Sequence, residues 1–458
     1  MEMEEISLDR DDNTIGLQDA LKDVFIDSLK FNEKLFNAFS KAYSAYIKTA
    51  FFYDKNNLVK DYSESEKILK STIGNIFDER FREEDFITTL SDTVASYSEL
   101  ARSTGFSQVY QNFSNFLSEW NNDIVEPIRD KLWRTPSYKV GSLEKYSLFR
   151  YDRIPNSNYN GSSNNSTTPR IPVLIIYGFI NRHYILDLLP EVSIASKLLK
   201  QGFDVYATDW GTPSAYDKDL TIGHFVNSYM DKSVDLIREI TKSDKVSLFG
   251  YCWGGNLVLM YAALHPDKVK NVVTIATPGD FSVDNTLLSV WTRRMKVDAL
   301  LDAFGNAPGM LLNTAFSLRN PIEQIYKYQR FFEQPHGLES AMEFFTTETW
   351  LYDSPPIIGE IYREFVKYCY QQNLFIKNQM KIDGSLVDLR SIKAPFLNII
   401  AQKDDLVTPA SSIALNNVIG SKDKSIIKFP SGHVGLIIGQ RAHKEVWPKV
   451  GGWLKDRS

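Results

Sequence analysis

A cysteine lies among closely spaced glycines in the segment Gly250-Tyr251-Cys252-Trp253-Gly254-Gly255. An apolar run, residues 246–249, precedes this segment, and a helical pattern, residues 256–264, follows it. A nucleophile on a tight strand-to-helix turn needs small neighbours, because the surrounding backbone approaches it closely. The N-terminus of the following helix favours a thiolate. We therefore predict that Cys252 is a catalytic nucleophile and not merely a buried apolar residue.

Two adjacent acids follow the nucleophile in the chain. A thiol nucleophile needs a base, and the base usually needs a carboxylate that orients it. The apolar run 396–400 is followed by Ala401-Gln402-Lys403-Asp404-Asp405, so both carboxyls come just after the carboxyl end of a predicted strand. Sheets of this kind keep their sites at that edge. Asp404 lies nearer the strand end, but the pattern leaves both acids open.

One of the six histidines has the setting of a catalytic base. His433 follows the acids in a glycine-flanked loop, Gly432-His433-Val434-Gly435, which gives it the freedom to project into a cleft. The order nucleophile, acid, histidine is that of α/β-hydrolases. We interpret His265 as a residue at the end of a helix and His443 as a solvated one. His433 is the predicted base.

Two backbone N–H groups are expected to stabilise the oxyanion formed during acyl transfer. One belongs to Trp253, directly after the nucleophile, and the second should come from the loop after the first strong strand, where we choose Phe179. No phosphate-binding loop, dinucleotide fingerprint or metal-binding histidine pair occurs in the sequence. We therefore expect no metal, and no residues can be assigned to a cofactor.

Apolar runs that alternate with helical stretches predict the fold. The runs, each short enough for a strand buried in a parallel sheet, are residues 173–177, 204–207, 246–249, 272–275 and 396–400. This alternation indicates a mostly parallel sheet covered by helices, here an α/β-hydrolase fold. We predict an N-terminal helical region at 1–130, a catalytic core at 131–277 and 391–458, and an inserted helical cap at 278–390. We expect this cap to cover the site and to move when substrate enters.

The composition limits which partners and which cellular location we expect for the protein. The 458 residues carry a formal charge of −5, which gives no electrostatic reason to expect nucleic acid as a partner. Cys252 and Cys369 are the only cysteines, too few for a disulfide framework. The first residues lack the pattern of a signal peptide, and no apolar run is long enough for a transmembrane helix. These features predict a cytoplasmic protein.

Several motifs together resemble those of polyhydroxyalkanoate synthases. They are the cysteine box at 250–255, Tyr177-Gly178-Phe179-Ile180-Asn181-Arg182, Thr208-Asp209-Trp210-Gly211, Lys403-Asp404-Asp405-Leu406-Val407-Thr408-Pro409 and Gly432-His433-Val434-Gly435. Within the predicted cap, Trp350-Leu351-Tyr352-Asp353-Ser354-Pro355 and Tyr370-Gln371-Gln372-Asn373 are similar to the class III branch. Asp405 stands where that family usually has His. The resemblance runs from about residue 130 to the C-terminus.

This resemblance implies a reaction and a set of roles. Cys252 would carry the acyl group, Asp404 rather than Asp405 would be the acid, and His433 would be the base. The substrate would be a 3-hydroxyacyl-coenzyme A, such as 3-hydroxybutyryl-CoA, polymerised into polyester with release of coenzyme A and without a further cofactor. The resemblance also implies a homodimer at the surface of polyester granules and a possible second, non-catalytic synthase subunit.

Other functions remain open at this point. A dienelactone-hydrolase-like enzyme also places Cys in such a box, but it is smaller and has no large cap. A thioesterase on the same fold would differ only in the acceptor of the acyl group. A catalytically inactive granule-binding protein would not need the three residues Cys252, Asp404 and His433.

Overall fold

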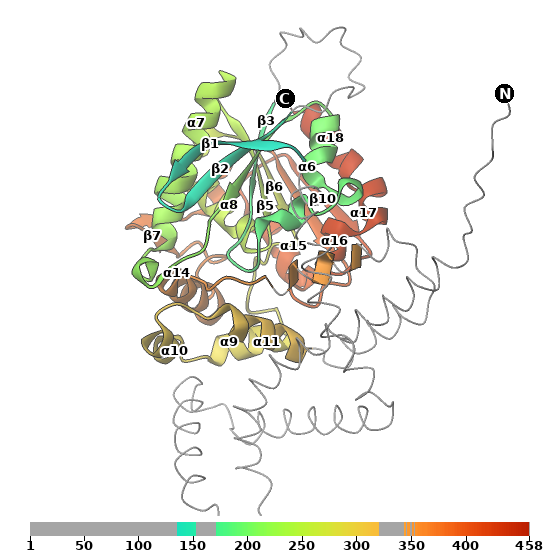
Figure 1. Cartoon of the computed structure of the whole chain (residues 1–458). Coiled ribbons are helices and arrows are strands. Elements are labelled where there is room, and N and C mark those ends of the chain that lie inside the picture. The colour runs from blue at the N-terminus through green and yellow to red at the C-terminus, as the bar shows by residue number, and fades with distance from the viewer. Residues whose placement is uncertain are drawn as a thin grey trace, which may run out of the picture. The chain divides into compact units, whose positions relative to one another are not determined.

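The structure, a computed structural model, describes residues 135–152, 171–319 and 343–457, apart from residues 345, 349 and 352. The predicted N-terminal helical region, residues 1–130, lies outside this part of the chain. Within the described residues, eight strands form one sheet in the order β1-β2-β4-β3-β5-β6-β9-β10 (Figure 1). The strands β1 and β2 are antiparallel to their neighbours, and all other pairs are parallel.

The strands are β1 (Ser137–Leu143), β2 (Tyr146–Tyr151), β3 (Pro172–Ile176), β4 (Asp204–Asp209), β5 (Val246–Tyr251), β6 (Val269–Ile275), β9 (Phe396–Ala401) and β10 (Lys424–Phe429). All five predicted strands are present. Every residue of β3, β5 and β9 is buried, as expected for continuous apolar runs covered on both faces. The hairpin β1–β2 was not predicted, because its sequence mixes polar and apolar residues without a clear period.

Helices cover both faces of this sheet. On one face, α6 (Ile194–Lys200) and α18 (Trp447–Lys455) pack against each other, and their apolar residues share a core with alternate residues of the central strands. On the other, α7 (Asp231–Thr241) and α8 (Trp253–Leu264) pack against β3 and β5 (Figure 1). α15 (Pro409–Val418) packs on β9. The remaining short elements are α16 (Gly435–Ile438), α17 (Gln440–Glu445), the π-helix η5 (His224–Met230) and the 3-10 turns η2 (His183–Leu186), η3 (Pro190–Val192), η4 (Ala215–Asp217), η6 (Pro266–Lys268) and η8 (Leu389–Ser391).

Between β6 and β9 the chain leaves the sheet at its carboxyl edge. The helices of this insertion gather at one end of the sheet (Figure 1). They are α9 (Leu287–Arg294), α10 (Val297–Phe304), α11 (Gly309–Arg319), α14 (Gly359–Glu364) and the π-helix η7 (Phe365–Gln371), followed by a small hairpin of β7 (Lys381–Ile382) and β8 (Ser385–Leu386). All of them fall within the segment 278–390 that we predicted as a cap, and we keep that name for it.

The turn between β5 and α8 depends on three glycines. A Cβ on Gly250 would lie 2.4 Å from the Cα of Gly255, and one on Gly254 would lie 2.3 Å from the carbonyl oxygen of Ile176. On Gly255 it would lie 1.9 Å from Thr277 Oγ1. Contacts this short admit no side chain, so the first turn of α8 can press against the ends of β3 and β6 only with glycine at these positions.

Substituting Gly255 tests this close approach, with Gly452 as a matched helical control. We expect Gly255→Ala to lower the free energy of unfolding by about 1–3 kcal/mol, the usual cost of an overpacked core. No heavy atom lies within 4 Å of a Cβ on Gly452, so Gly452→Ala should leave stability unchanged or raise it by up to ~1 kcal/mol. Urea denaturation followed by circular dichroism measures both. Equal effects of the two variants would contradict the packing described.

Candidate active site

Cys252 lies at the turn between β5 and α8 in a strained backbone conformation. Its φ of 54° and ψ of −126° are rare for a residue with a side chain. The backbone is held there by two hydrogen bonds: Cys252 N–H donates to the Ile275 carbonyl at 2.9 Å, and its own carbonyl accepts from Gly255 N–H at 2.9 Å. The side chain is half-buried at the N-terminus of α8. The structure thus has the predicted elbow.

Asp404 and His433 lie together beside this elbow. His433 Nδ1 is 2.7 Å from Asp404 Oδ2, and both residues are buried. The other carboxylate oxygen, Oδ1, accepts from the backbone N–H groups of Leu406 and Val407, each at 2.9 Å. Three donors therefore hold the Asp404 carboxylate in one orientation, whereas Asp405 is exposed. The turn after β9 therefore places Asp404, and not Asp405, against His433, a choice that the sequence pattern alone had left open.

Charge around the His433 imidazole favours its protonated form. Burial alone would lower the pKa of His433. The negative charge of Asp404 and, after it, the electrostatic effect of the neighbouring Cys252 outweigh burial and raise that pKa to about 10. A hydrogen bond with the Cys252 side chain contributes in the same direction. The imidazole thus lies between a carboxylate and a thiol, and the site stabilises a proton on the ring.

His265 and His443, the other two histidines considered as a catalytic base, lie away from the elbow. His265 is the C-cap of α8, which confirms the prediction of a helix-end residue. Its Nε2 is 3.0 Å from Asn227 Oδ1. The interpretation of His443 as solvated was wrong. It is buried in α17, its Nε2 lies 2.5 Å from the Ile437 carbonyl, and burial lowers its pKa to about 4. Packing against α18, which the local sequence does not reveal, accounts for the difference.

The cap covers the elbow with aromatic side chains. The ring of Phe365 stacks on Trp253 with centroids 4.2 Å apart, and Trp253 Nε1 lies 3.4 Å from the Tyr370 hydroxyl. Both cap residues come from the π-helix η7, a rare geometry that is frequent at functional sites. On the core side, Tyr251 packs on His433 at 5.0 Å. Aromatic side chains of the cap and the core therefore lie around the elbow, while the Cys252 side chain itself stays partly exposed.

Phe179, the predicted second oxyanion donor, lies in the loop after β3. A Cβ on the preceding Gly178 would be 3.2 Å from Trp253 Cβ and 3.3 Å from the Gly254 nitrogen, so this loop directly contacts the elbow. The Phe179 ring is buried, and its centroid lies 5.9 Å from that of Trp210 and 5.0 Å from that of Phe225. The structure thus brings the loop of Phe179 and the backbone of Trp253 together.

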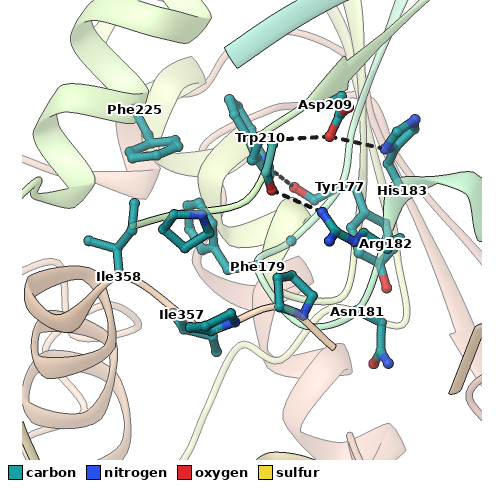
Figure 2. Close-up of a pocket in the computed structure, with 15 residues that line it drawn as sticks. Tyr177, Phe179, Asn181, Arg182, His183, Asp209, Trp210, Phe225, Ile357 and Ile358 are labelled. Carbon is teal, nitrogen blue, oxygen red and sulfur yellow. Dashed lines mark hydrogen bonds and ion pairs between the residues drawn. The ribbon is translucent and has the colours of Figure 1, made fainter. Parts of the chain in front are cut away.

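A small pocket opens beside this loop, between the core and the cap (Figure 2). Its apolar wall includes Phe179, Trp210, Phe225, Ile357 and Ile358. Its polar end carries Arg182, His183 and Asp209, where His183 Nδ1 is 3.4 Å from Asp209 Oδ1. Cys252 and His433 are not among its lining residues, so the pocket neighbours the oxyanion loop but does not contain the thiol.

Sequence reasoning assigned no role to several residues that the structure places around the site. Tyr370 and Phe365 cover the elbow from the cap, and Asn181 and Arg182 tie the loop of Phe179 to the segment around Asp353. Some of these residues stand in motifs that carried the family resemblance, which was the only available signal. Asn181 and Arg182 pair with residues about 170 positions away, and Tyr370 pairs with Trp253, which is 117 positions away, so these contacts leave no local pattern.

The site and the sheet define the class of this protein, and a matching family model agrees. A family model described as the alpha/beta hydrolase fold matches residues 171–440. A solved carboxyl esterase from Bacillus coagulans aligns with a TM-score of 0.48 at 15% identity, over 70% of this chain and 98% of that one. With its mostly parallel sheet and its elbow after β5, the chain is an α/β-hydrolase-fold protein.

More similar relatives define the family. The poly(3-hydroxyalkanoate) polymerase subunit PhaC of Allochromatium vinosum is 40% identical over 70% of this chain and 89% of its own length. The proteins of the same name from Thiocystis violacea and Synechocystis are 39% and 37% identical, over 71% and 70% of this chain and 89% and 86% of their own. The chain belongs to the poly(3-hydroxyalkanoate) polymerase family.

Two further features are absent from the part of the chain that the structure describes. No group of three or more His, Cys, Asp or Glu side chains there is arranged to hold a metal ion. Across the same residues, no helix is both long and apolar enough to cross a membrane.

The raised pKa of His433 predicts how stability depends on pH. A histidine whose pKa is higher in the folded state stabilises the fold fully below its unfolded pKa of about 6.5, and this stabilisation is lost as pH rises through the folded value. The folded value is about 10. We expect the loss between these values to be on the order of a few kcal/mol and to be reduced in Asp404→Asn.

Urea denaturation at several pH values measures this dependence, with Asp405→Asn as the matched control. The control carboxyl is exposed, so that variant should follow the wild type. The same pair of variants tests catalysis, since Asp404→Asn should lower activity far more than Asp405→Asn. Similar profiles and similar activities for the two variants would contradict the pairing of Asp404 with His433.

Proposed function

We propose that this chain polymerises 3-hydroxyacyl-coenzyme A thioesters, carrying the acyl group on Cys252. The observation that carries this proposal is the Asp404–His433 pair beside a strained elbow cysteine, in a chain of the poly(3-hydroxyalkanoate) polymerase family. An elbow with cysteine in place of serine suits thioester exchange. The attacking group and the departing coenzyme A group are then both thiolates, so the two are of similar strength as leaving groups.

The first half-reaction acylates the enzyme. His433 takes the proton of the Cys252 thiol, and the sulfur attacks the thioester carbonyl carbon. The resulting oxyanion would accept hydrogen bonds from the backbone N–H groups of Trp253 and Phe179. As the tetrahedral intermediate collapses, the bond to the coenzyme A sulfur breaks, and His433 returns its proton to that sulfur. Coenzyme A leaves, and Cys252 holds the acyl group as a thioester.

The second half-reaction extends the chain. The 3-hydroxyl group of the acyl acceptor gives its proton to His433, and its oxygen attacks the acyl carbon on Cys252. An ester bond forms, the bond to the Cys252 sulfur breaks, and the thiolate and imidazolium remain as a pair. Asp404 supports both steps, because its hydrogen bond to Nδ1 orients the ring and stabilises the imidazolium.

Hydrolysis is the competing fate of the acyl-enzyme and the alternative function. A hydrolase or thioesterase with the same three residues would pass the acyl group to water. The aromatic cover of Phe365 and Tyr370 over the elbow favours transfer to a bound hydroxyl, because it limits access of water. Measuring free coenzyme A together with insoluble polyester distinguishes these outcomes, since a hydrolase would release coenzyme A and soluble acid only.

We extend the proposal to the setting of the reaction. Each relative reported above is named as a subunit, which supports assembly with a second synthase subunit. A homodimer is proposed with it, and coenzyme A thioester is the substrate with no separate cofactor. Because the polyester product is insoluble in water, the enzyme would reside at the surface of polymer granules in the cytoplasm.

Substitution of the two cysteines tests the nucleophile. We expect Cys252→Ala to abolish coenzyme A release while the protein remains folded. Cys369 is buried in η7, and burial raises the pKa of its thiol, so that thiol is held in its unreactive protonated form. Cys369→Ala should therefore keep most of the activity. Normal coenzyme A release by Cys252→Ala would exclude the proposed mechanism.

The stacking of Phe365 on Trp253 predicts that the cap moves when substrate enters. We expect hydrogen exchange in η7 (Phe365–Gln371) to change when a non-hydrolysable acyl-coenzyme A analogue binds, whereas exchange in the buried strand β9 stays constant. Free enzyme should also react faster at Cys252 with N-ethylmaleimide than with a maleimide that carries a bulky substituent, once each rate is divided by the rate of the same reagent with a free thiol. Unchanged exchange in η7 together with equal reaction rates would show that the site is already open.

A further inference from the structure

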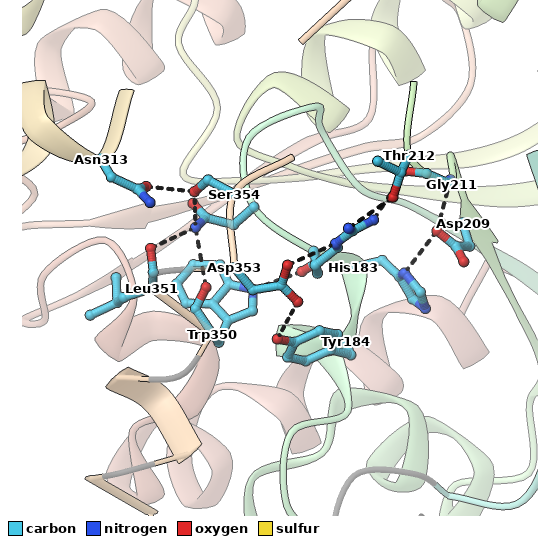
Figure 3. Close-up of polar contacts among 12 residues, drawn as sticks. His183, Tyr184, Asp209, Gly211, Thr212, Asn313, Trp350, Leu351, Asp353 and Ser354 are labelled. Carbon is cyan, nitrogen blue, oxygen red and sulfur yellow. Dashed lines mark hydrogen bonds and ion pairs between the residues drawn. The ribbon is translucent and has the colours of Figure 1, made fainter. Parts of the chain in front are cut away.

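A dense set of hydrogen bonds joins the loop after β3 to the cap (Figure 3). We call it the latch, formed by Asn181, Arg182 and Tyr184 of the loop and by Trp350, Leu351, Asp353 and Ser354 of the cap. The Asn181 amide donates to the carbonyls of Trp350 and Leu351, at 3.2 and 2.9 Å, and to Ser354 Oγ at 2.7 Å. In return, Trp350 Nε1 donates to the Arg182 carbonyl at 2.7 Å.

A carboxylate of the cap completes the latch. Asp353 accepts from Arg182 Nε at 3.1 Å through one oxygen and from the Tyr184 hydroxyl at 2.9 Å through the other (Figure 3). The planar guanidinium of Arg182 can bond several partners at once. Here its two remaining nitrogens donate to the Gly211 carbonyl at 3.1 Å and to Thr212 Oγ1 at 2.9 Å. Arg182 thereby connects the loop with the cap and with the turn after β4.

The latched loop is the one that contacts the nucleophile elbow. Gly178, three residues before Asn181, lies against the backbone of Trp253 and Gly254. On the same loop, the Tyr177 carbonyl accepts from Trp210 Nε1 at 2.8 Å. Asn181 itself has a φ of 61°, a left-handed conformation that asparagine adopts more readily than most residues. The chain from 177 to 184 is thus held by the elbow on one side and by the cap on the other.

We infer that Asn181 and Asp353 are positioning residues: through the latch they set the backbone N–H of Phe179 at the distance that an acyl oxyanion requires. The inference rests on the proposed function, because it assumes an acyl group on Cys252. Oxyanion stabilisation depends on donors fixed within a few tenths of an ångström of the developing charge. A loop that follows a sheet strand gains that precision when its far end is also fixed.

The latch also gives the cap a means to control chemistry. Residues 350–354 belong to the cap, so a cap that is out of place would leave the loop without its hydrogen bonds. The second oxyanion donor would then be poorly placed until the cap closes over substrate. The reactive site would be complete only when water is already excluded, which limits hydrolysis of the acyl-enzyme.

Two variants weaken the latch without enlarging or shrinking a side chain. Asn181→Asp keeps the shape and tolerates the left-handed backbone, but it sets a carboxylate against two carbonyl oxygens that now accept from the amide. Asp353→Asn is milder, because it removes the charge that pairs with Arg182 and keeps an acceptor. Asp388→Asn is the matched control, since it breaks the pair with Arg390, which the latch does not involve.

Two rates distinguish positioning of the oxyanion loop from general support of the fold. Acyl transfer passes through an oxyanion, whereas alkylation of a thiol by iodoacetamide does not. Complete removal of one oxyanion donor typically lowers kcat by about 100–1,000-fold. For a displaced donor we expect kcat for coenzyme A release to fall about 10–100-fold in Asn181→Asp and less in Asp353→Asn. The KM should stay within about 3-fold, and alkylation of Cys252 should be as fast as in the wild type or faster.

Other results would overturn the inference. Values of kcat within about 2-fold of the wild type in both variants would exclude a positioning role for the latch. A joint loss of coenzyme A release and alkylation would show that the latch supports the nucleophile or the fold instead, as would an equal effect of Asp388→Asn. These results leave the proposed function intact as long as Cys252→Ala abolishes turnover, so the two failures can be told apart.

Discussion

The contact between the first turn of α8 and the end of β3 is the constraint on which the site depends. Gly254 lies so close to the Ile176 carbonyl and to Gly178 that no side chain fits between them. This approach brings the loop of Phe179 next to the elbow and puts Cys252 into a strained backbone conformation at the helix N-terminus. The proposed nucleophile and the two proposed oxyanion donors therefore lie on two separate segments that are held together by backbone packing.

The charged part of the site comes from the two loops that follow β9 and β10. Asp404 is held by the backbone N–H groups of Leu406 and Val407, and it in turn holds His433. Because the carboxylate and the imidazole are both buried, their attraction is not screened by water, and the ring is stabilised in its protonated form. The result is a base that can hold the thiol proton and return it to a leaving group.

The cap interacts with the site at two distinct places. Phe365 and Tyr370 of η7 cover the elbow through aromatic contacts, which can separate and re-form without breaking a strong bond. Asn181 and Arg182 bind Trp350, Leu351, Asp353 and Ser354 through directional hydrogen bonds. The aromatic contacts of η7 suit a cover that opens. The hydrogen bonds of the latch suit a connection that forms only when the cap is in place.

Elements with a local signal could be predicted from the amino-acid sequence. Continuous apolar runs predicted β3, β4, β5, β6 and β9, and the glycine spacing around Cys252 predicted the elbow, because burial on both faces and close backbone approach each restrict the residue types at adjacent positions. The glycine-flanked loop of His433 was equally visible. The folded structure was needed to choose between the two adjacent acids on geometric grounds, since the turn after β9 directs one carboxylate to His433 and exposes the next. It alone revealed the burial of His443 and the pairing of Asn181 with the cap. Those contacts join residues far apart in the chain, and a hydrogen bond between distant segments imposes no period or spacing on either of them.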